Sequence, residues 1–146
     1  MKIIIFFLSI LVILLAAFLM FIYLLPKTPL AEINGHVFSL YLAQTSEEQS
    51  VGLAKYNKIN QNQGMLFLFQ KADNYSFWMK DMQFPIDIIF IKDNKVVDIF
   101  QKVPVSSNEN LPVYTTKTKA DKVLEINSGL TSKYGIKIGS EVRINL

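Results

Sequence analysis

Two hydrophobic patterns divide the chain: a continuous apolar run at its start and, over most of the remainder, an alternation with a period of two. The run covers residues 3–25, which are 23 residues without a charged side chain. As a helix rising about 1.5 Å per residue it would extend roughly 35 Å, enough to cross a bilayer. The sequence therefore predicts a transmembrane anchor over residues 1–25, a linker over 26–30 and a single domain over 31–146.

A cleavable signal peptide is the alternative to an anchor. Lys2 supplies its basic start, but its apolar core should be about 7 to 15 residues long and should end at a small-x-small cleavage site. Here the bulky residues 24–26 close the run. Lys2 before the run and Lys27 after it leave a slight preference for an N-terminus inside. We therefore expect a single-pass protein of the cell membrane that contacts lipid through residues 3–25 and places its domain outside the cytoplasm.

The rest of the chain alternates apolar and polar side chains in short runs, as strands with one buried face do. Asn34-Gly35 fits a type I′ turn, after which residues 37–42 alternate. Further strands are predicted at Met65–Phe69, Tyr75–Lys80, Ile86–Lys92, Val96–Phe100, Val123–Ile126 and Val142–Leu146. The first two of these should pair across a turn at residues 71–74, and Asp93-Asn94 should make the next turn. Such short strands favour a mainly β fold, an antiparallel β-sandwich or barrel.

One or two short helices and one long loop interrupt the strands. Thr45 and Glu48 have the spacing of a capping box, which predicts a helix start. Ser128 can cap a one-turn helix that Gly135 ends. Residues 101–121 are polar and contain prolines, and a loop of this length is usually functional or mobile.

Composition changes the picture once the anchor is set aside. Residues 31–146 are numerous enough for one domain with its own core. Of the 15 Lys and Arg residues, Lys2 and Lys27 precede the domain, which leaves 13 against 12 acidic residues. This balance and the scattered lysines give no support to nucleic-acid binding. The absence of cysteine excludes disulfides, thiolate catalysis and zinc fingers.

The stretch Gly64–Ile91 carries a family resemblance. It contains a Gly-Met-Leu-Phe strand, a Phe-Trp-Met-Lys strand and a Pro-x-Asp-Ile-Ile-Phe-Ile strand in this order. It resembles the bacterial and archaeal family called domain of unknown function 192, and the Leu-Glu-Ile-Asn-Ser-Gly tail extends the resemblance over roughly residues 43–146. The resemblance implies a mainly β, jelly-roll-like topology and supplies no function. One departure is Asp81-Met82, where the family usually has Asn-Thr.

Asp87 and Glu125 are the candidate catalytic carboxylates. Each lies between apolar neighbours in a predicted strand, so each carboxylate is expected inside the sheet or at its mouth. A buried carboxylate needs a partner, and Asp87 can accept from backbone amides or from the Trp78 indole in a structural role. Alternatively, if the two carboxylates converge in a cleft at roughly 5–10 Å, they supply the pair that glycoside hydrolysis requires.

Trp78, Met79, Asp87 and Glu125 are the candidate ligand-binding residues. Trp78 and Met79 are neighbours on a predicted strand and should point to opposite faces, so only one can line a given pocket. Tyr75, Phe77 and Met79 would share a face and could form an aromatic platform, although such residues most often belong to a core.

A copper site is the candidate metal centre. Met65, Met79 and Met82 supply thioethers and His36 the only imidazole, a donor set that suits Cu(I). The plainer interpretation is that the methionines fill the core and that His36 is exposed beside a turn.

Motifs for other chemistry are missing from the sequence: it has no Gly-x-Ser-x-Gly elbow, phosphate-binding glycine loop or His-Glu-x-x-His. The sequence therefore favours a binding module without a cofactor over an enzyme. We expect this module to bind a small ligand or an envelope protein. The two alternatives are a carboxylate-dependent hydrolase of envelope glycans and a methionine-based copper-handling protein.

Overall fold

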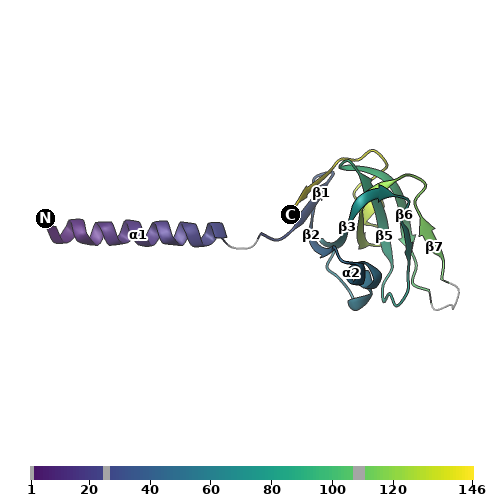
Figure 1. The fold of residues 1–146 in the computed structure, drawn as a ribbon, viewed down its shortest axis with the longest axis horizontal. Helices are drawn as coiled ribbons and strands as arrows, with labels where there is room; N and C mark the ends of the chain where they lie inside the picture. Colours follow the sequence, from purple (N-terminus) through teal and green to yellow (C-terminus); the bar gives the residue numbers. More distant parts are fainter. Residues whose placement is uncertain (1, 25–26, 107–110) are drawn as a thin grey trace.

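The apolar run at the start of the chain forms one continuous helix. A computed structural model describes residues 2–24, 27–106 and 111–146, and in it α1 (Lys2–Leu24) stands apart from the β-rich remainder (Figure 1). The segment Phe6–Tyr23 is long and apolar enough to cross a membrane, a property that transmembrane helices share with signal sequences. Residue 25, the last of the predicted anchor, and residue 26, the first of the predicted linker, lie outside the described residues.

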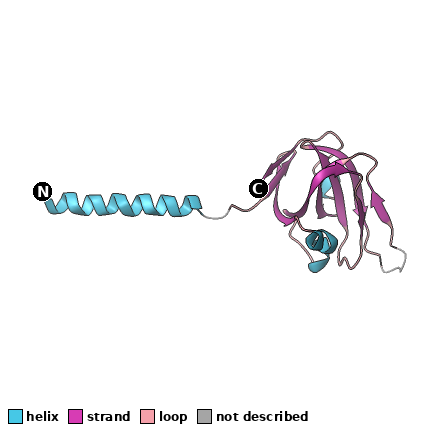
Figure 2. Ribbon diagram, viewed as in Figure 1, coloured by secondary structure: helices cyan, strands magenta, loops and turns pink. Residues whose placement is uncertain are grey.

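A single curled sheet of seven strands dominates the remainder and resembles half a barrel (Figure 2). Its strand order is β6-β5-β8-β3-β2-β1-β9, and two further strands, β4 and β7, form a separate antiparallel ribbon. The strands are β1 (Leu30–Ile33), β2 (His36–Ala43), β3 (Gln63–Asp73), β4 (Ser76–Trp78), β5 (Ile86–Lys92), β6 (Lys95–Val103), β7 (Val113–Thr115), β8 (Ala120–Asn127) and β9 (Val142–Asn145). The predicted mainly β fold is confirmed.

Three short helical segments complete the fold: α2 (Ser46–Val51), the 3₁₀ helix η1 (Gly52–Lys55) and α3 (Leu130–Lys133). The predicted capping box starts α2, because the Glu48 amide donates to the Thr45 hydroxyl at 3.2 Å and the Thr45 amide donates back to the Glu48 carboxylate at 3.0 Å. The prediction for α3 was wrong by one residue. Gly129 is its N-cap in place of Ser128, with a φ of 83° that glycine adopts without strain.

The expectation of a purely antiparallel, jelly-roll-like sheet was wrong at one pair of strands. β2 and β3 run parallel, from the pair Ser39 and Gln63 to the pair Ala43 and Phe67. Parallel neighbours require a long crossover connection, usually helical, and α2 with η1 provides it between these strands. The sheet is therefore mixed, with a strand-helix-strand unit at its centre.

The pairing expected between the strands at Met65 and Tyr75 was also wrong. β3 pairs with β2 and β8, whereas β4 leaves the sheet and pairs with β7. β7 falls within the segment 101–121 that was predicted to be loop, and β6 extends into that segment as far as Val103. Cross-strand contacts explain this order, since the hydroxyls of Ser76 and Thr115 hydrogen-bond at 2.7 Å. Residues 107–110 of the predicted loop lie outside the described residues.

Both faces of the central sheet are covered, which makes β5 buried along nearly its whole length. On one face, Ile89, Ile91, Leu124 and Ile126 pack in a core that the curl of the sheet and α3 enclose. The opposite face carries a second core beneath the β4–β7 ribbon and η1. Its members include Leu53, Met65, Phe67, Met79, Ile88 and Phe90. The candidate site lies on this second face.

Candidate functional site

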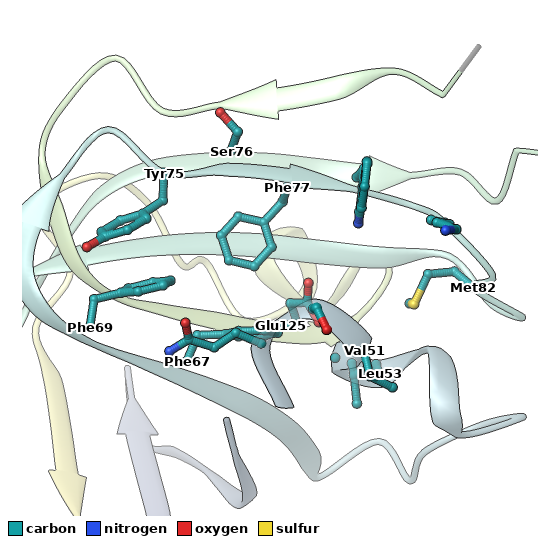
Figure 3. A pocket seen from close by; sticks show the side chains of 14 residues that line it. Val51, Leu53, Phe67, Phe69, Tyr75, Ser76, Phe77, Met82 and Glu125 are labelled. Atoms are coloured by element: carbon teal, nitrogen blue, oxygen red, sulfur yellow. The ribbon is translucent and has the colours of Figure 1, made fainter. Parts of the chain in front are cut away.

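A pocket of about 140 Å³ opens beside the second core, where the α2–η1 segment and strand β4 approach the sheet (Figure 3). Its walls come from segments that are distant in the sequence. The lining residues are Gln49, Ser50, Val51, Gly52, Leu53, Phe67, Phe69, Tyr75, Ser76, Phe77, Trp78, Lys80, Met82 and Glu125.

Local chemistry fixes the wall formed by α2 and η1. The capping box sets the start of α2, and the Gln49 side chain ties the helix to the sheet by donating to the Leu68 carbonyl at 2.9 Å. The chain then turns at Gly52, whose φ is 54°. A side chain there would meet the Phe67 ring at 3.2 Å and the Glu125 carboxyl at 3.9 Å, so the backbone can approach the pocket floor only as glycine.

Aromatic rings form the wall opposite the helix. Phe77 on β4 contacts the rings of Phe67 and Phe90 edge to face, with centroids 5.0 Å and 5.7 Å away. Phe69 and Tyr75 stack at 3.6 Å, and the Tyr75 hydroxyl donates to the backbone carbonyl of Lys71. These contacts hold the ribbon against the sheet and give the pocket one aromatic wall.

Glu125 lies at the floor of the pocket, between Phe77 and Leu53 (Figure 3). It belongs to β8, where Met65 and Ile88 are its neighbours on the two adjacent strands. The residue is only 5% exposed, and among the described residues its Oε2 atom has no hydrogen-bond partner. Burial raises the pKa of this carboxyl from 4.5 to about 8, because the charged form would lose its hydration.

This pKa decides what Glu125 can do. At neutral pH the side chain holds a proton and presents an O–H donor together with an acceptor oxygen in an apolar surrounding. A buried polar group without a partner destabilises the fold, so such a group in a cavity is suited to a ligand or to bound water.

Trp78 and Lys80 lie at the mouth of the pocket. The Trp78 side chain is 54% exposed, and the Lys80 Nζ atom lies 5.8 Å from the centre of its ring. Met79 between them is buried in the second core and does not line the pocket. The predicted strand Tyr75–Lys80 is shorter in the structure, since β4 ends at Trp78, and of the two neighbours Trp78 and Met79 only Trp78 lines the pocket.

Asp87 has a different environment from Glu125. It is completely buried and accepts four hydrogen bonds. The amides of Lys102, Gly129 and Thr131 donate at 2.7, 3.0 and 2.9 Å, and the Thr131 hydroxyl donates at 2.6 Å. The partners agree with the structural role considered from the sequence, except that the Trp78 indole is not one of them. Asp87 joins β6 and the start of α3 to the central strand.

The structure separates the two carboxylates that the hydrolase hypothesis required to converge. Asp87 is paired with Ile126, whereas Glu125 is paired with Ile88. Directly paired residues share a face and successive residues alternate, so Asp87 and Glu125 point to opposite faces of the sheet. The convergent pair that the hydrolase alternative required is therefore not formed. The two carboxylates would share a face only if β5 and β8 were paired in a register shifted by one residue.

The candidate imidazole ligand for copper, His36, lies apart from the three candidate methionines. Met65, Met79 and Met82 are buried together in the second core, and only Met82 lines the pocket. His36 begins β2 and stacks on Tyr134 with ring centroids 3.7 Å apart. Among the described residues, no three His, Asp or Glu side chains are grouped in a way that could hold a metal ion.

The sequence analysis missed several residues of the pocket. Gly52, Phe67 and Phe69 were assigned to a helix or to strands, and Lys80 was regarded only as part of a motif. The capping box indicated the helix that forms one wall, but nothing local indicates which strand that helix covers. Of the four candidate ligand-binding residues, Trp78 and Glu125 line the pocket, whereas Met79 and Asp87 do not.

The fold and the site define a class of small mainly β domains. Its features are a mixed half-barrel, the β4–β7 ribbon, and a pocket between ribbon and sheet that encloses the Glu125 carboxyl. The chain belongs to the family DUF192, described as an uncharacterised ancient conserved region, whose profile matches residues 30–144.

Two solved structures share this fold. A protein of unknown function from Novosphingobium aromaticivorans is 34% identical, with a TM-score of 0.72 over 78% of this chain and 83% of that protein. A protein from Sinorhizobium meliloti, described as a proposed transcription regulator, is 24% identical, with a TM-score of 0.73 over 81% of this chain and 94% of its own length. The second similarity concerns the fold alone. No curated protein sequence matches the chain.

Proposed function

We propose that this protein is a membrane-tethered binding module that holds a small ligand in the Glu125 pocket. One observation carries the proposal: a carboxyl oxygen without a hydrogen-bond partner is buried at the floor of a cavity. A ligand that bonds this oxygen would remove the cost of its burial. Apolar walls with a few polar groups are the usual composition of small-molecule sites.

The size of the cavity limits the ligand. A cavity of roughly 150 Å³ in another protein holds a benzene molecule, and the pocket here has about 140 Å³. The part of the ligand that enters is therefore about the size of one six-membered ring. A larger molecule can extend over the exposed Trp78 at the mouth.

The tether is the second part of the proposal. α1 supplies one apolar helix long enough for a single span. Lys2 before the helix and Lys27 after it give, by the positive-inside rule, a slight preference for an N-terminus in the cytoplasm. In that orientation the domain lies outside the cytoplasm, where the pocket would meet envelope or external solutes.

Fragment binding tests the module. The full-length chain, kept in detergent micelles, is screened by thermal unfolding against neutral, acidic and basic fragments of one ring. We expect some fragments to raise the Tm of the wild type, because they bond Glu125 only in the folded state.

Two valine substitutions locate the binding. Val51→Phe places a ring in the pocket, while Val37→Phe makes the same change at an equally exposed position on β2, outside this pocket. The hits should lose their effect in V51F and keep it in V37F. Failure of all fragments to raise the Tm of the wild type, or equal effects in both variants, would contradict the proposed function.

A further inference from the structure

Three polar groups of the pocket are available to a ligand: the Glu125 carboxyl at its floor, and the Lys80 ammonium and the Trp78 indole N–H at its mouth. The amide of Gln49 and the hydroxyls of Ser50 and Ser76 already form hydrogen bonds within the protein. Lys80 is exposed, and among the described residues no carboxylate forms an ion pair with it. The polar character of the site therefore depends on these three side chains, of which Glu125 and Lys80 are ionisable.

The charges of the two groups are unequal at neutral pH. Burial raises the pKa of Glu125 to about 8, so this residue is a neutral O–H donor, while the exposed Lys80 is a cation. The pocket thus offers hydrogen-bond donors and one uncompensated positive charge. A ligand that complements it supplies acceptors and one negative charge.

Other titratable groups near the pocket do not reverse this balance. Tyr75 donates its hydroxyl to a backbone carbonyl, and burial raises its pKa, so it stays neutral. β3 and β5 place only apolar side chains beside Glu125, namely those of Met65 and Ile88. Lys55, Lys80 and Asp81 all line the adjoining surface groove, so the groove keeps one net positive charge.

We propose that the ligand is a small monocarboxylate, which accepts a hydrogen bond from the Glu125 O–H and is balanced in charge by Lys80. Its apolar part packs against the rings of Phe67, Phe77 and Trp78. This inference rests on the proposed function and names the chemical class of its ligand. A carboxylate and a carboxylic acid share one proton well in a dry site, whereas two carboxylates repel each other.

An organic ammonium is the opposing possibility, since aromatic rings also attract cations. It would require Glu125 in its ionised form and would place a second cation beside Lys80. The two classes differ in the sign of their pH dependence. Affinity for a carboxylate falls as the pH passes 8, and affinity for an ammonium rises there.

Three probes of matched shape separate the classes: benzoate, benzamide and benzylamine, titrated calorimetrically into the full-length chain in micelles between pH 6 and pH 9. We expect benzoate to bind most tightly and to lose about tenfold in affinity from pH 7 to pH 9, because ionisation of Glu125 leaves about one molecule in ten competent. Benzamide should show no such dependence.

Variants assign the effect to the two residues. Glu125→Gln keeps a donor that cannot ionise, so it should bind benzoate with an affinity that no longer changes with pH. Lys80→Gln should weaken benzoate several-fold at every pH and leave benzamide unchanged. Asp81→Asn, next to Lys80 but outside the pocket lining, is the matched control and should not weaken benzoate.

Two results would overturn the inference. Tighter binding of benzylamine that strengthens through pH 8 would assign the site to a cation, and the proposed binding function would stand. Failure of benzoate to bind, with fragment hits of another class still blocked by V51F, would likewise reject the carboxylate and keep the module. Loss of all hits is the separate result that rejects the module itself.

Discussion

Asp87 and Glu125 are two carboxylic acids buried in neighbouring strands with opposite environments. Asp87 accepts four hydrogen bonds, three of them from backbone amides. Glu125 has apolar neighbours and a cavity, and its Oε2 atom is without a partner among the described residues. Burial without donors favours the protonated form of Glu125 and raises its pKa. From residue types alone, these two acids are indistinguishable.

Glu125→Gln should change the pH dependence of stability. Above pH 4.5 the unfolded chain releases the Glu125 proton that the folded chain keeps until about pH 8. The free energy of unfolding of the wild type therefore falls with rising pH over this window and levels off above it. We expect the difference between E125Q and the wild type to grow by about 3 kcal/mol in favour of the variant from pH 4 to pH 7, measured by urea unfolding.

Asp87→Asn is the matched comparison for this experiment. It exchanges an acceptor oxygen for an amide group that faces donors, so it should lower the free energy of unfolding by about 3 kcal/mol or more at pH 7. A pH profile of E125Q parallel to that of the wild type would show that Glu125 is ionised in the folded protein.

Among the elements, the contact between β3 and β8 brings the pocket floor and the sheet centre together. Gly64 on β3 faces Ile126 on β8, and the next pair along is Met65 with Glu125. A Cβ atom at Gly64 would lie 2.7 Å from the backbone oxygen of Glu125 and 3.1 Å from the Leu124 side chain. Only glycine allows the two strands to approach this closely.

Gly64→Ala should therefore destabilise the protein by on the order of 2 kcal/mol and lower its Tm, because the strands must shift to admit the methyl group. Gly35→Asn is the control. Gly35 occupies the β1–β2 turn with a φ of 77° and open space around it, and asparagine tolerates that conformation. A Tm for G64A close to that of G35N would mean that the strands accommodate the methyl group without cost.

The elements that could be predicted are those set by local chemistry. The Asn34-Gly35 turn has φ values of 50° and 77°, Asp93-Asn94 repeats this geometry, and β5 has the predicted bounds. Long-range pairing could not be predicted in the same way. The parallel β2–β3 contact and the removal of β4 to a ribbon depend on which distant strand each element meets.

The candidate site was predictable to the same limited extent. Alternation along β8 and β4 identified Glu125 and Trp78, but the face that each side chain occupies depends on strand register. Asp87 lies on the other face of the sheet because the pairing of β5 with β8 is one residue away from the register that would have put it beside Glu125. The pKa of Glu125 follows from the neighbours that register brings, and a sequence does not contain that information locally.

At the scale of the whole molecule, the chain combines an apolar helix with a domain that lacks cysteine. This composition makes a single introduced cysteine a clean probe of topology. Lys119→Cys places a thiol at an exposed position just before β8. If the domain lies outside the cytoplasm, we expect a membrane-impermeant maleimide to label K119C in intact cells.

The same experiment also tests the tether. If α1 anchors the chain in the bilayer as proposed, the labelled chain should remain in the membrane fraction after washing with alkaline carbonate. The wild-type chain, which has no cysteine, should not react with the maleimide and is the control for specificity. Labelling of K119C in permeabilised cells is the control for access to the thiol. Labelling only after permeabilisation would place the domain inside, and release by carbonate would remove the anchor from the proposal.

The position of β1 between β2 and β9 has a consequence for biosynthesis. β1 follows closely after α1, whereas its partner β9 reaches Asn145. While the chain emerges from the ribosome, one edge of β1 has no strand to pair with until β9 has been made, after the other strands of the sheet. An open edge of this kind pairs readily with other chains. The sheet is completed only after synthesis of the domain, so quality-control factors that meet the nascent chain encounter it unfinished.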